Sequence, residues 1–189
     1  EAIVLKSNLN LLIKKMKEKN YDAFLVPRGD VFSGEEVPKN EERLKYISNF
    51  SGSAGYAIIS SVPKLKSAIF SDGRYKIQLK KEVNSKKFDI FEGGIKEAYC
   101  FLKKNQKKLN LIAIDPWLIT CTQYEYLNKA LSKTKSQIDF IDENLIDKIW
   151  INKPKQVEEK IFKLSFKQSG ATSSGKINRL KKIIVKHNC

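Results

Sequence analysis

The stretch "RLKYISNFSGSAGYAII", residues 43–59, begins with the apolar spacing of a helix and ends as a strand, with small residues between them. Leu44 and Ile47 recur at the helical interval, whereas residues 57–59 form a short apolar run that is typical of a buried strand. The joint at residues 51–55 could cradle a phosphate or form a tight corner. No lysine directly follows it, so a phosphate would lack its charged partner. We predict a corner, where small residues let helix and strand approach closely.

On both sides of this joint, apolar periodicity predicts alternating helices and strands. Helices are expected at residues 5–19, 41–48, 72–83, 93–108 and, after Pro116, up to 133; strands are expected at 22–27, 55–60, 66–71, 87–91, 109–115 and 136–142. Residues 143–150 are expected to close the domain as a turn or a helix. The pattern indicates an α/β fold, in which helices flank a mixed sheet of about five or six strands that includes one hairpin.

The regular pattern ends after Trp150. We predict a first domain over residues 1–152, a linker over 153–171 that is rich in Pro, Gly, Ser and charge, and an amphipathic helix over 172–189. Thr172 is a suitable N-cap for that helix. Apolar residues recur along one side of it, which suggests the beginning of a truncated second domain: Ile177, Leu180, Ile183 and Ile184.

Composition narrows the class of protein. Hydrophobic residues make up 41% of the 189 residues, which is enough for a core, and no apolar run approaches the ~20 residues that cross a bilayer. The first residues lack the features of a signal peptide. The three cysteines show no paired spacing, which suggests reduced thiols. We therefore expect a cytoplasmic protein without a membrane partner.

The net charge of +15 invites a nucleic-acid interpretation. The lysines fall mainly on the polar faces of expected helices, and such faces are usually solvated. No aromatic stacking platform or recognition helix stands out, so nucleic-acid binding through basic faces stays a weaker alternative.

Residues for independent catalysis are not apparent. The single histidine is His187, close to the end of the sequence, and no spacing typical of metal ligands occurs. Residues 170–176 resemble a phosphate loop, but Ile177 stands where a hydroxyl should hold magnesium. Residues 28–30 spell an adhesion tripeptide, for which a turn after a strand is the simpler interpretation. We predict no catalytic residue, no metal ligand and no cofactor in this segment.

The turn "SDGRY", residues 71–75, has its own chemistry. Asp72 can cap the following helix and Gly73 permits the turn. Arg74 offers a planar donor group for a carboxylate or a backbone carbonyl. We favour a buried Arg74 that ties strand to helix, and a substrate-facing Arg74 is the alternative.

Four blocks in consistent order carry a family resemblance: "VPRGDVFSGEEVPKNEERLKYISNFSGSAGYAII", "IFSDGRYKIQ", "IDPWLIT" and "ENLIDKIW". Over residues 5–152 the sequence resembles the amino-terminal domain of aminopeptidase P, the Xaa-Pro aminopeptidase of the creatinase and prolidase group. The likeness is to the long, three-domain cytosolic form, and it implies a creatinase-like fold for residues 1–152.

The resemblance implies a parent enzyme that removes the amino-terminal residue preceding proline. Its two divalent metals, typically manganese, lie in a carboxy-terminal domain, held by two Asp, two Glu and one His, and this chain contains none of those motifs. What it implies here is a non-catalytic domain that leans over the active-site mouth, limits peptide access and contributes to homodimer contacts. The partners would be peptides with proline at the second position.

The resemblance also implies candidate residues near the substrate channel or a neighbouring domain: Phe50, Ser51 and Arg74, and more weakly Tyr46 and Asn49. Packing inside the domain is the alternative for each of them. Trp117 and Trp150 are expected to be packing anchors, and Trp150 could pack against the missing domains.

A second function class stays open beside the enzyme fragment. Aminopeptidase-like domains without peptidase activity serve as peptide- or histone-binding modules in histone chaperones. The positive charge of this chain fits acidic partners better than it fits basic histones.

Overall fold

Six strands of the first unit form one mixed sheet with the order β4-β3-β2-β1-β5-β6. The computed structural model describes residues 7–188 and divides the chain into two units, Glu1–Gln156 and Val157–Cys189, which are described separately. The strands are β1 (Ala23–Pro27), β2 (Tyr56–Ser60), β3 (Ser67–Ser71), β4 (Phe88–Glu92), β5 (Leu111–Ile114) and β6 (Gln137–Phe140). The predicted α/β class and mixed sheet are confirmed.

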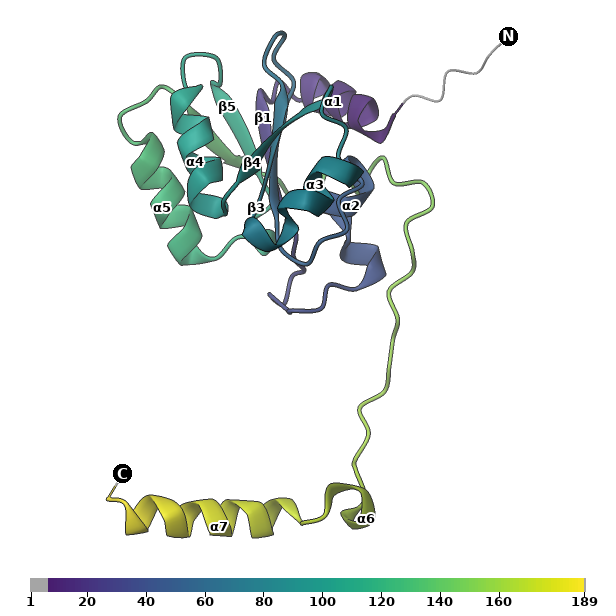
Figure 1. The fold of residues 1–189 in the computed structure, drawn as a ribbon, viewed down its shortest axis with the longest axis vertical. Coiled ribbons are helices and arrows are strands. Elements are labelled where there is room, and N and C mark those ends of the chain that lie inside the picture. The colour runs from purple at the N-terminus through teal and green to yellow at the C-terminus, as the bar shows by residue number, and fades with distance from the viewer. Residues whose placement is uncertain (1–6, 189) are drawn as a thin grey trace. The chain divides into compact units, whose positions relative to one another are not determined.

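Strand direction determines where the loops gather. β2 pairs antiparallel with β3, as the predicted hairpin requires, and it also pairs antiparallel with β1. The other pairings, β1 with β5, β3 with β4 and β5 with β6, are parallel. The carboxyl ends of β1, β3, β4, β5 and β6 therefore meet at one edge, together with the start of β2. We call it the carboxyl edge; it is the lower edge of the sheet in Figure 1.

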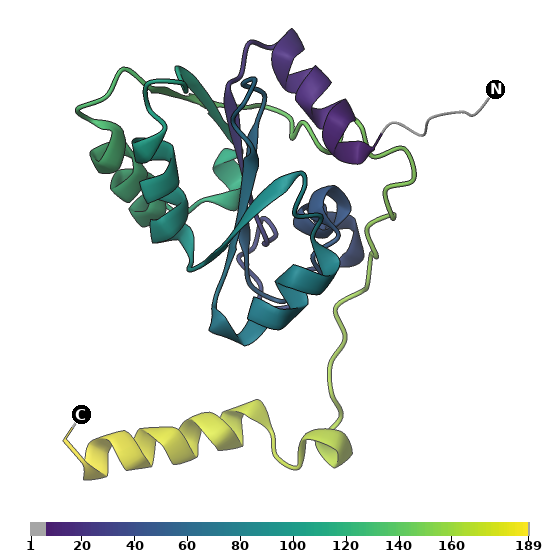
Figure 2. The ribbon, with the colours of Figure 1, turned by 45° about the horizontal axis from the view of Figure 1, so that its top comes forward.

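Helices cover both faces of the sheet. On one face lie α1 (Asn8–Glu18), α2 (Arg43–Ser48) and α3 (Lys76–Glu82), and on the other lie α4 (Ile95–Lys104) and α5 (Cys121–Leu131) (Figures 1 and 2). Three short 3-10 turns, Lys39–Glu41, Gly73–Tyr75 and Pro116–Leu118, lead towards α2, α3 and α5. The sheet is thus the middle layer of three.

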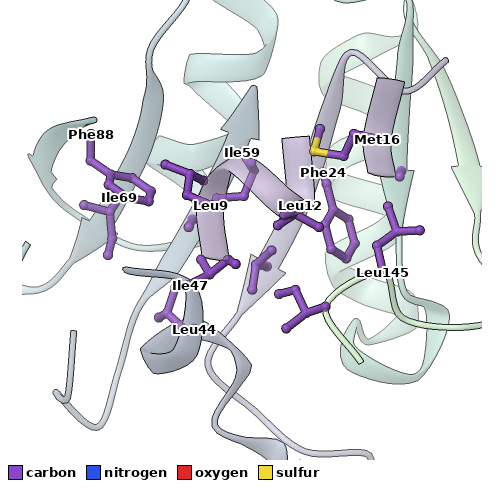
Figure 3. Close-up of a cluster of buried hydrophobic side chains, with 14 of the residues drawn as sticks. Leu9, Leu12, Met16, Phe24, Leu44, Ile47, Ile59, Ile69, Phe88 and Leu145 are labelled. Atoms are coloured by element: carbon purple, nitrogen blue, oxygen red, sulfur yellow. The ribbon is translucent and has the colours of Figure 1, made fainter. Parts of the chain in front are cut away.

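Two cores follow from the alternation of side chains along the strands. On the α1 side, Phe24 and Ile59 meet Leu12 and Met16 of α1 and Leu44 of α2 (Figure 3). Residues one position along the strands, such as Leu25 and Ile58, point to the core beneath α4 and α5. β1 and β2 therefore each contribute to both cores, which explains their nearly continuous apolar sequences.

The five helices of the first unit begin later than the sequence pattern predicts, and side-chain caps explain two of these differences. The first described helix begins at Asn8, because Ser7 caps it by accepting from the backbone of Asn10; residues 5 and 6 of the expected helix lie outside the described residues. The expectation that a helix follows Pro116 directly is wrong by several residues. Thr120 and Gln123 form a reciprocal capping box, so α5 begins at Cys121.

The segment that closes the first unit, residues 143–150, is a series of turns rather than a helix. Leu145 and Ile146 are buried in the core on the α1 side, and the Asn144 amide donates to the carboxylate of Asp115 at 2.8 Å. The buried hydrogen bond of the Asn144 amide stabilises the non-helical backbone of this segment. The spacing of apolar residues in the sequence does not reveal such a contact.

The second unit contains α6 (Phe166–Ser169) and α7 (Ser173–Lys186). The predicted cap is confirmed, since the Thr172 hydroxyl accepts from the backbone of Gly175 at 3.1 Å. The apolar side of α7 is exposed, with Ile177, Leu180 and Ile183 each more than half accessible. Among residues 7–188, no helix is both long and apolar enough to cross a bilayer.

Candidate functional site at the carboxyl edge

Large apolar side chains stand exposed along the carboxyl edge. Val31 and Phe32 follow β1, Ile77 follows β3, and Trp117 follows β5; Phe32 is 81% exposed, and Ile77 and Trp117 are each 72% exposed. Single exposed apolar residues are ordinary, but several beyond the carboxyl ends of β1, β3 and β5 indicate an interaction surface. The expectation that Trp117 is a packing anchor is therefore wrong, because the turn after Asp115 directs it to the surface.

The corner at residues 51–55 lies in the middle of this edge, before β2. A Cβ on Gly52 would lie 2.2 Å from a ring carbon of Phe50 and 2.8 Å from one of Tyr75. A Cβ on Gly55 would lie 3.1 Å from a methyl carbon of Leu44. The small residues therefore permit a close approach of α2, β2 and the turn before α3, as the corner interpretation predicts.

Phe50 supports the corner from within. It is 1% exposed, and its ring packs edge-on against Tyr75 at 5.7 Å between centroids. Because Phe50 is buried, it can affect the surface only by supporting the corner residues that pack against it.

Ser51 is exposed but fixed. Its backbone N–H and its hydroxyl donate to the two carboxylate oxygens of Glu82 at 2.7 and 2.8 Å, and the Gln78 amide donates to the Ser51 hydroxyl at 2.8 Å. Partial burial raises the pKa of Glu82, but the bonds from Ser51 and Gln78 outweigh it and hold that pKa below its usual value. Glu82 therefore stays ionised and anchors the corner to α3.

A second set of bonds joins Ser53 to its neighbours. Its hydroxyl lies 2.5 Å from the hydroxyl of Tyr75, and this bond lowers the pKa of Tyr75. Its carbonyl accepts from Arg28 at 3.0 Å, and Arg28 also pairs with Glu42 at 3.1 Å. Arg28, Ser53 and Tyr75 thus join three segments through their hydrogen bonds: the end of β1, the corner, and the turn before α3.

Arg74 extends from the turn between β3 and α3, with its side chain 71% exposed. It makes a two-pronged pair with Asp72, at 2.9 Å from Nε and 2.8 Å from Nη2. Asp72 also caps the turn, as predicted, by accepting from the backbone of Arg74, and the guanidinium lowers the pKa of Asp72. The buried-arginine interpretation that we favoured is wrong, because the local pair with Asp72 holds Arg74 at the surface.

Two further candidates have structural neighbours of their own. Asn49 ends α2 in the left-handed conformation, with a φ of 66°, and its backbone donates to Lys45. Tyr46 stacks on Trp150 at 4.4 Å and 18° between the rings, and its hydroxyl donates to the Ile149 carbonyl. Trp150 is therefore a packing anchor within the first unit, as expected.

The structure brings Phe50, Ser51 and Arg74 to one corner and turn, whereas Tyr46 contacts the closing segment. Sequence reasoning missed Gln78 and Glu82, which hold Ser51. Their spacing of four residues predicts that they share a helix face. The sequence near these residues does not show that Ser51, which lies in the corner before β2, packs against that face of α3.

Within residues 7–188, no group of three or more His, Cys, Asp and Glu side chains is arranged to hold a metal ion.

Comparison with known proteins agrees with this architecture. Residues 9–149 match the creatinase/prolidase N-terminal domain model, so the chain belongs to that family. It is 34% identical over 170 residues to a probable Xaa-Pro aminopeptidase P of Laccaria bicolor, covering 88% of this chain and 26% of that protein. It is 31% identical over 179 residues to a probable Xaa-Pro aminopeptidase P of Pyrenophora teres f. teres, covering 93% and 27%.

A solved structure shares the fold. The X-prolyl aminopeptidase of Caenorhabditis elegans, described as a cytosolic enzyme with a di-nuclear active site, superposes with a TM-score of 0.76 at 23% identity, over 96% of this chain and 31% of that one. The chain therefore spans less than a third of each of these three proteins.

Proposed function

We propose that this chain is the non-catalytic amino-terminal domain of an Xaa-Pro aminopeptidase, and that its carboxyl edge lies at the mouth of an active site carried elsewhere in the parent protein. The family match supports the identity of the domain. The observation that carries the role is the carboxyl edge itself, where a rigidly held Ser51 and an exposed Arg74 lie among exposed apolar side chains.

In this proposal the parent protein removes an amino-terminal residue that precedes proline, using two divalent metals, most simply manganese, bound in its carboxy-terminal part. None of the residues of this chain is assigned a catalytic or metal-binding role. The parent works in the cytoplasm on peptides with proline at the second position, and this domain also contributes to homodimer contacts. The relatives' names and the di-nuclear neighbour support the assignment.

The proposed organisation is a domain over residues 1–152, a linker over 153–171 and the first helix of a second domain over 172–189. The exposed apolar side of α7 supports the last element, because such a stripe normally packs against further chain.

The five candidate residues act in different ways. Arg74 can donate to a peptide carboxylate or backbone carbonyl, since only part of its five-donor group is directed at Asp72. Ser51 presents a fixed rim, and Phe50 positions that rim from below. Asn49 and Tyr46, at and before the end of α2, are proposed to face the neighbouring domain rather than the peptide.

The proposal is tested by activity measurements on separated parts. The purified 189-residue chain should release no amino-terminal residue from an Xaa-Pro peptide when manganese is added. Adding the remainder of the parent protein should give manganese-dependent release. Turnover by the 189-residue chain alone would overturn the proposal, as would an intact parent that shows none.

A further inference from the structure

A groove of about 420 Å³ lies between the edge strand β4 and helix α4. Three phenylalanine rings and Leu65 form its apolar lining. Phe91 stacks on Phe70 at 5.1 Å between centroids, and Phe101 lies 6.0 Å from each of them. Phe70 is buried, whereas Phe91 is 39% exposed, so the aromatic cluster opens to the surface.

The charge of this groove differs from that of the chain. Its lining includes three carboxylates, Asp89, Glu92 and Glu97, and one ammonium group, Lys104. The whole chain instead carries 36 Lys and Arg against 21 Asp and Glu. An apolar groove with an acidic rim complements a ligand that is both apolar and cationic.

Two of the rim carboxylates have partners that a ligand can replace. Asp89 pairs with Lys66 at 3.0 Å and Glu92 pairs with Lys76 at 3.1 Å, and all four side chains are 44–62% exposed. Exposed pairs of this kind contribute little stability, so an incoming cation can exchange with the lysines.

The backbone of β4 offers a second kind of contact. Among the described strands, β4 pairs only with β3 and stands at the end of the sheet order. An edge strand presents unpaired N–H and C=O groups, to which an extended peptide can add as a further strand. Asp89 and Phe91, two positions apart on β4, both line the groove, so a strand added there would alternate side chains into it.

We propose that the groove between β4 and α4 binds an extended peptide segment in which apolar side chains alternate with Lys or Arg. In an added strand, an apolar side chain enters the groove and packs on Phe91 and Phe101, and its cationic neighbours point to the opposite face of that strand, where Glu92 lies beside Lys76. No residue of the corner at 51–55 lines this groove, so this peptide is a binding partner in addition to the substrate of the proposed enzyme.

The first test uses the 189-residue chain and two synthetic peptides labelled with a fluorophore. Acetyl-Arg-Leu-Arg-Leu-Arg-amide should bind saturably in an anisotropy titration, at least tenfold more tightly than acetyl-Glu-Leu-Glu-Leu-Glu-amide. Its affinity should fall as salt rises. No saturable binding, or equal affinity for the two peptides, would overturn the proposal.

The second test localises the site with a matched pair of variants. Phe91→Lys should weaken binding of the arginine peptide at least tenfold. Phe140→Lys should leave it unchanged, because Phe140 is similarly exposed, at 45%, but ends the opposite edge strand β6. Glu92→Lys provides a surface variant with the same expected loss if Phe91→Lys does not fold. Equal effects at Phe91 and Phe140, or no loss with folded Glu92→Lys, would contradict the assignment.

Cysteine reactivity gives an independent readout in the unmodified sequence. Cys100 lines the groove and Cys121 begins α5, and both are exposed free thiols. Bound peptide should slow the reaction of Cys100 with a maleimide while Cys121 reacts as before. Equal protection of both thiols, or protection of neither at saturating peptide, would argue against binding in the groove.

Discussion

Gly52 lies where the buried ring of Phe50 turns back beneath the corner, and its lack of a side chain is a packing requirement. The φ of Gly52 is not in the left-handed region, so conformational freedom is not the reason for glycine here. The ring atoms of Phe50 and Tyr75 occupy the space where a Cβ would be. At the scale of single residues, the shape of the candidate site therefore depends on the lack of a Cβ atom at Gly52.

The first prediction is that Gly52→Ala destabilises the domain by about 1–3 kcal/mol, the usual cost of overpacking a filled core. The added Cβ would approach Phe50 to 2.2 Å, and the buried ring has little room to move. Urea unfolding measures the change. Gly29→Ala is the matched control, because nothing lies within 4 Å of its added Cβ, and it should be nearly neutral. Equal stability of the two variants would contradict the packing argument.

The buried guanidinium of Arg43 joins α2 to the closing segment. Its Nε and Nη2 donate to the two oxygens of Asp147 at 2.8 and 2.7 Å, and Nη1 pairs with Glu41. Burial raises the pKa of Asp147, but the bonds from Arg43 and Lys153 outweigh it and lower that pKa. A carboxyl whose pKa is lower in the folded state stabilises the fold above its unfolded value, near 4, and loses that contribution as pH falls through the folded value.

The second prediction is that Asp147→Asn costs roughly 3 kcal/mol at neutral pH, because it leaves the Arg43 charge incompletely paired. The stability of the variant should also fall less steeply than that of the parent sequence below about pH 4. Urea unfolding across a pH series measures both effects. Glu143→Gln, which removes an exposed pair with Lys148, should leave the unfolding midpoint unchanged. If the stabilities of Asp147→Asn and the parent sequence fell equally steeply below about pH 4, the link between the pKa of Asp147 and stability would be refuted.

At the scale of elements, the sequence predicts most strongly where local pattern and tertiary environment agree. β1, β2 and β3 are short apolar runs because both faces of each strand are buried, and all three are predicted from these local runs. The start of α5 was misplaced because the Thr120 capping box outweighs the proline that precedes it. The exposure of Trp117 follows from the turn that Asp115 caps, whereas the turns at 143–150 depend on a long-range contact between Asn144 and Asp115.

The candidate site shows the same limit. The corner follows from its small residues, and the Asp72 cap follows from its position before a helix. The exposure of Arg74 depends on its ion pair with Asp72, two residues earlier. The spacing of these residues in the sequence does not predict that the pair forms. The anchoring of Ser51 by Glu82 joins residues 31 positions apart, so it required the fold.

The third prediction concerns the closing segment as an element. Leu145 and Ile146 are 3% and 0% exposed, and Asp147 pairs with Arg43, so a chain ending at residue 140 should not fold cooperatively. A chain ending at residue 156 keeps the whole first unit and should unfold at the same temperature as the 189-residue chain. Thermal unfolding followed by circular dichroism measures both. Cooperative unfolding of the shorter chain would show that residues 141–150 are dispensable.

At the scale of the whole molecule, the three-layer fold brings the carboxyl ends of five strands to one edge. Exposed apolar and polar side chains are both found along that edge. In the proposed function, the partner of this edge is the remainder of the parent protein; the chain spans less than a third of the two Xaa-Pro aminopeptidase P relatives described above. The fourth prediction is that a side chain at this edge affects how the parent protein engages its peptide, whereas one at the opposite edge does not. Arg74 and Lys107 provide that comparison, because Lys107 lies in the exposed turn before β5.

The most direct measurement is the steady-state kinetics of the parent protein on an Xaa-Pro peptide, with Arg74→Ala beside Lys107→Ala. Losing a charge-assisted contact to the peptide should lower kcat/KM by about tenfold for Arg74→Ala, mainly through KM, because the contact forms before the chemical step. Lys107→Ala should match the parent sequence. Unchanged kcat/KM for Arg74→Ala, or the same loss in both variants, would contradict the claim that the carboxyl edge lies at the entrance to the active site.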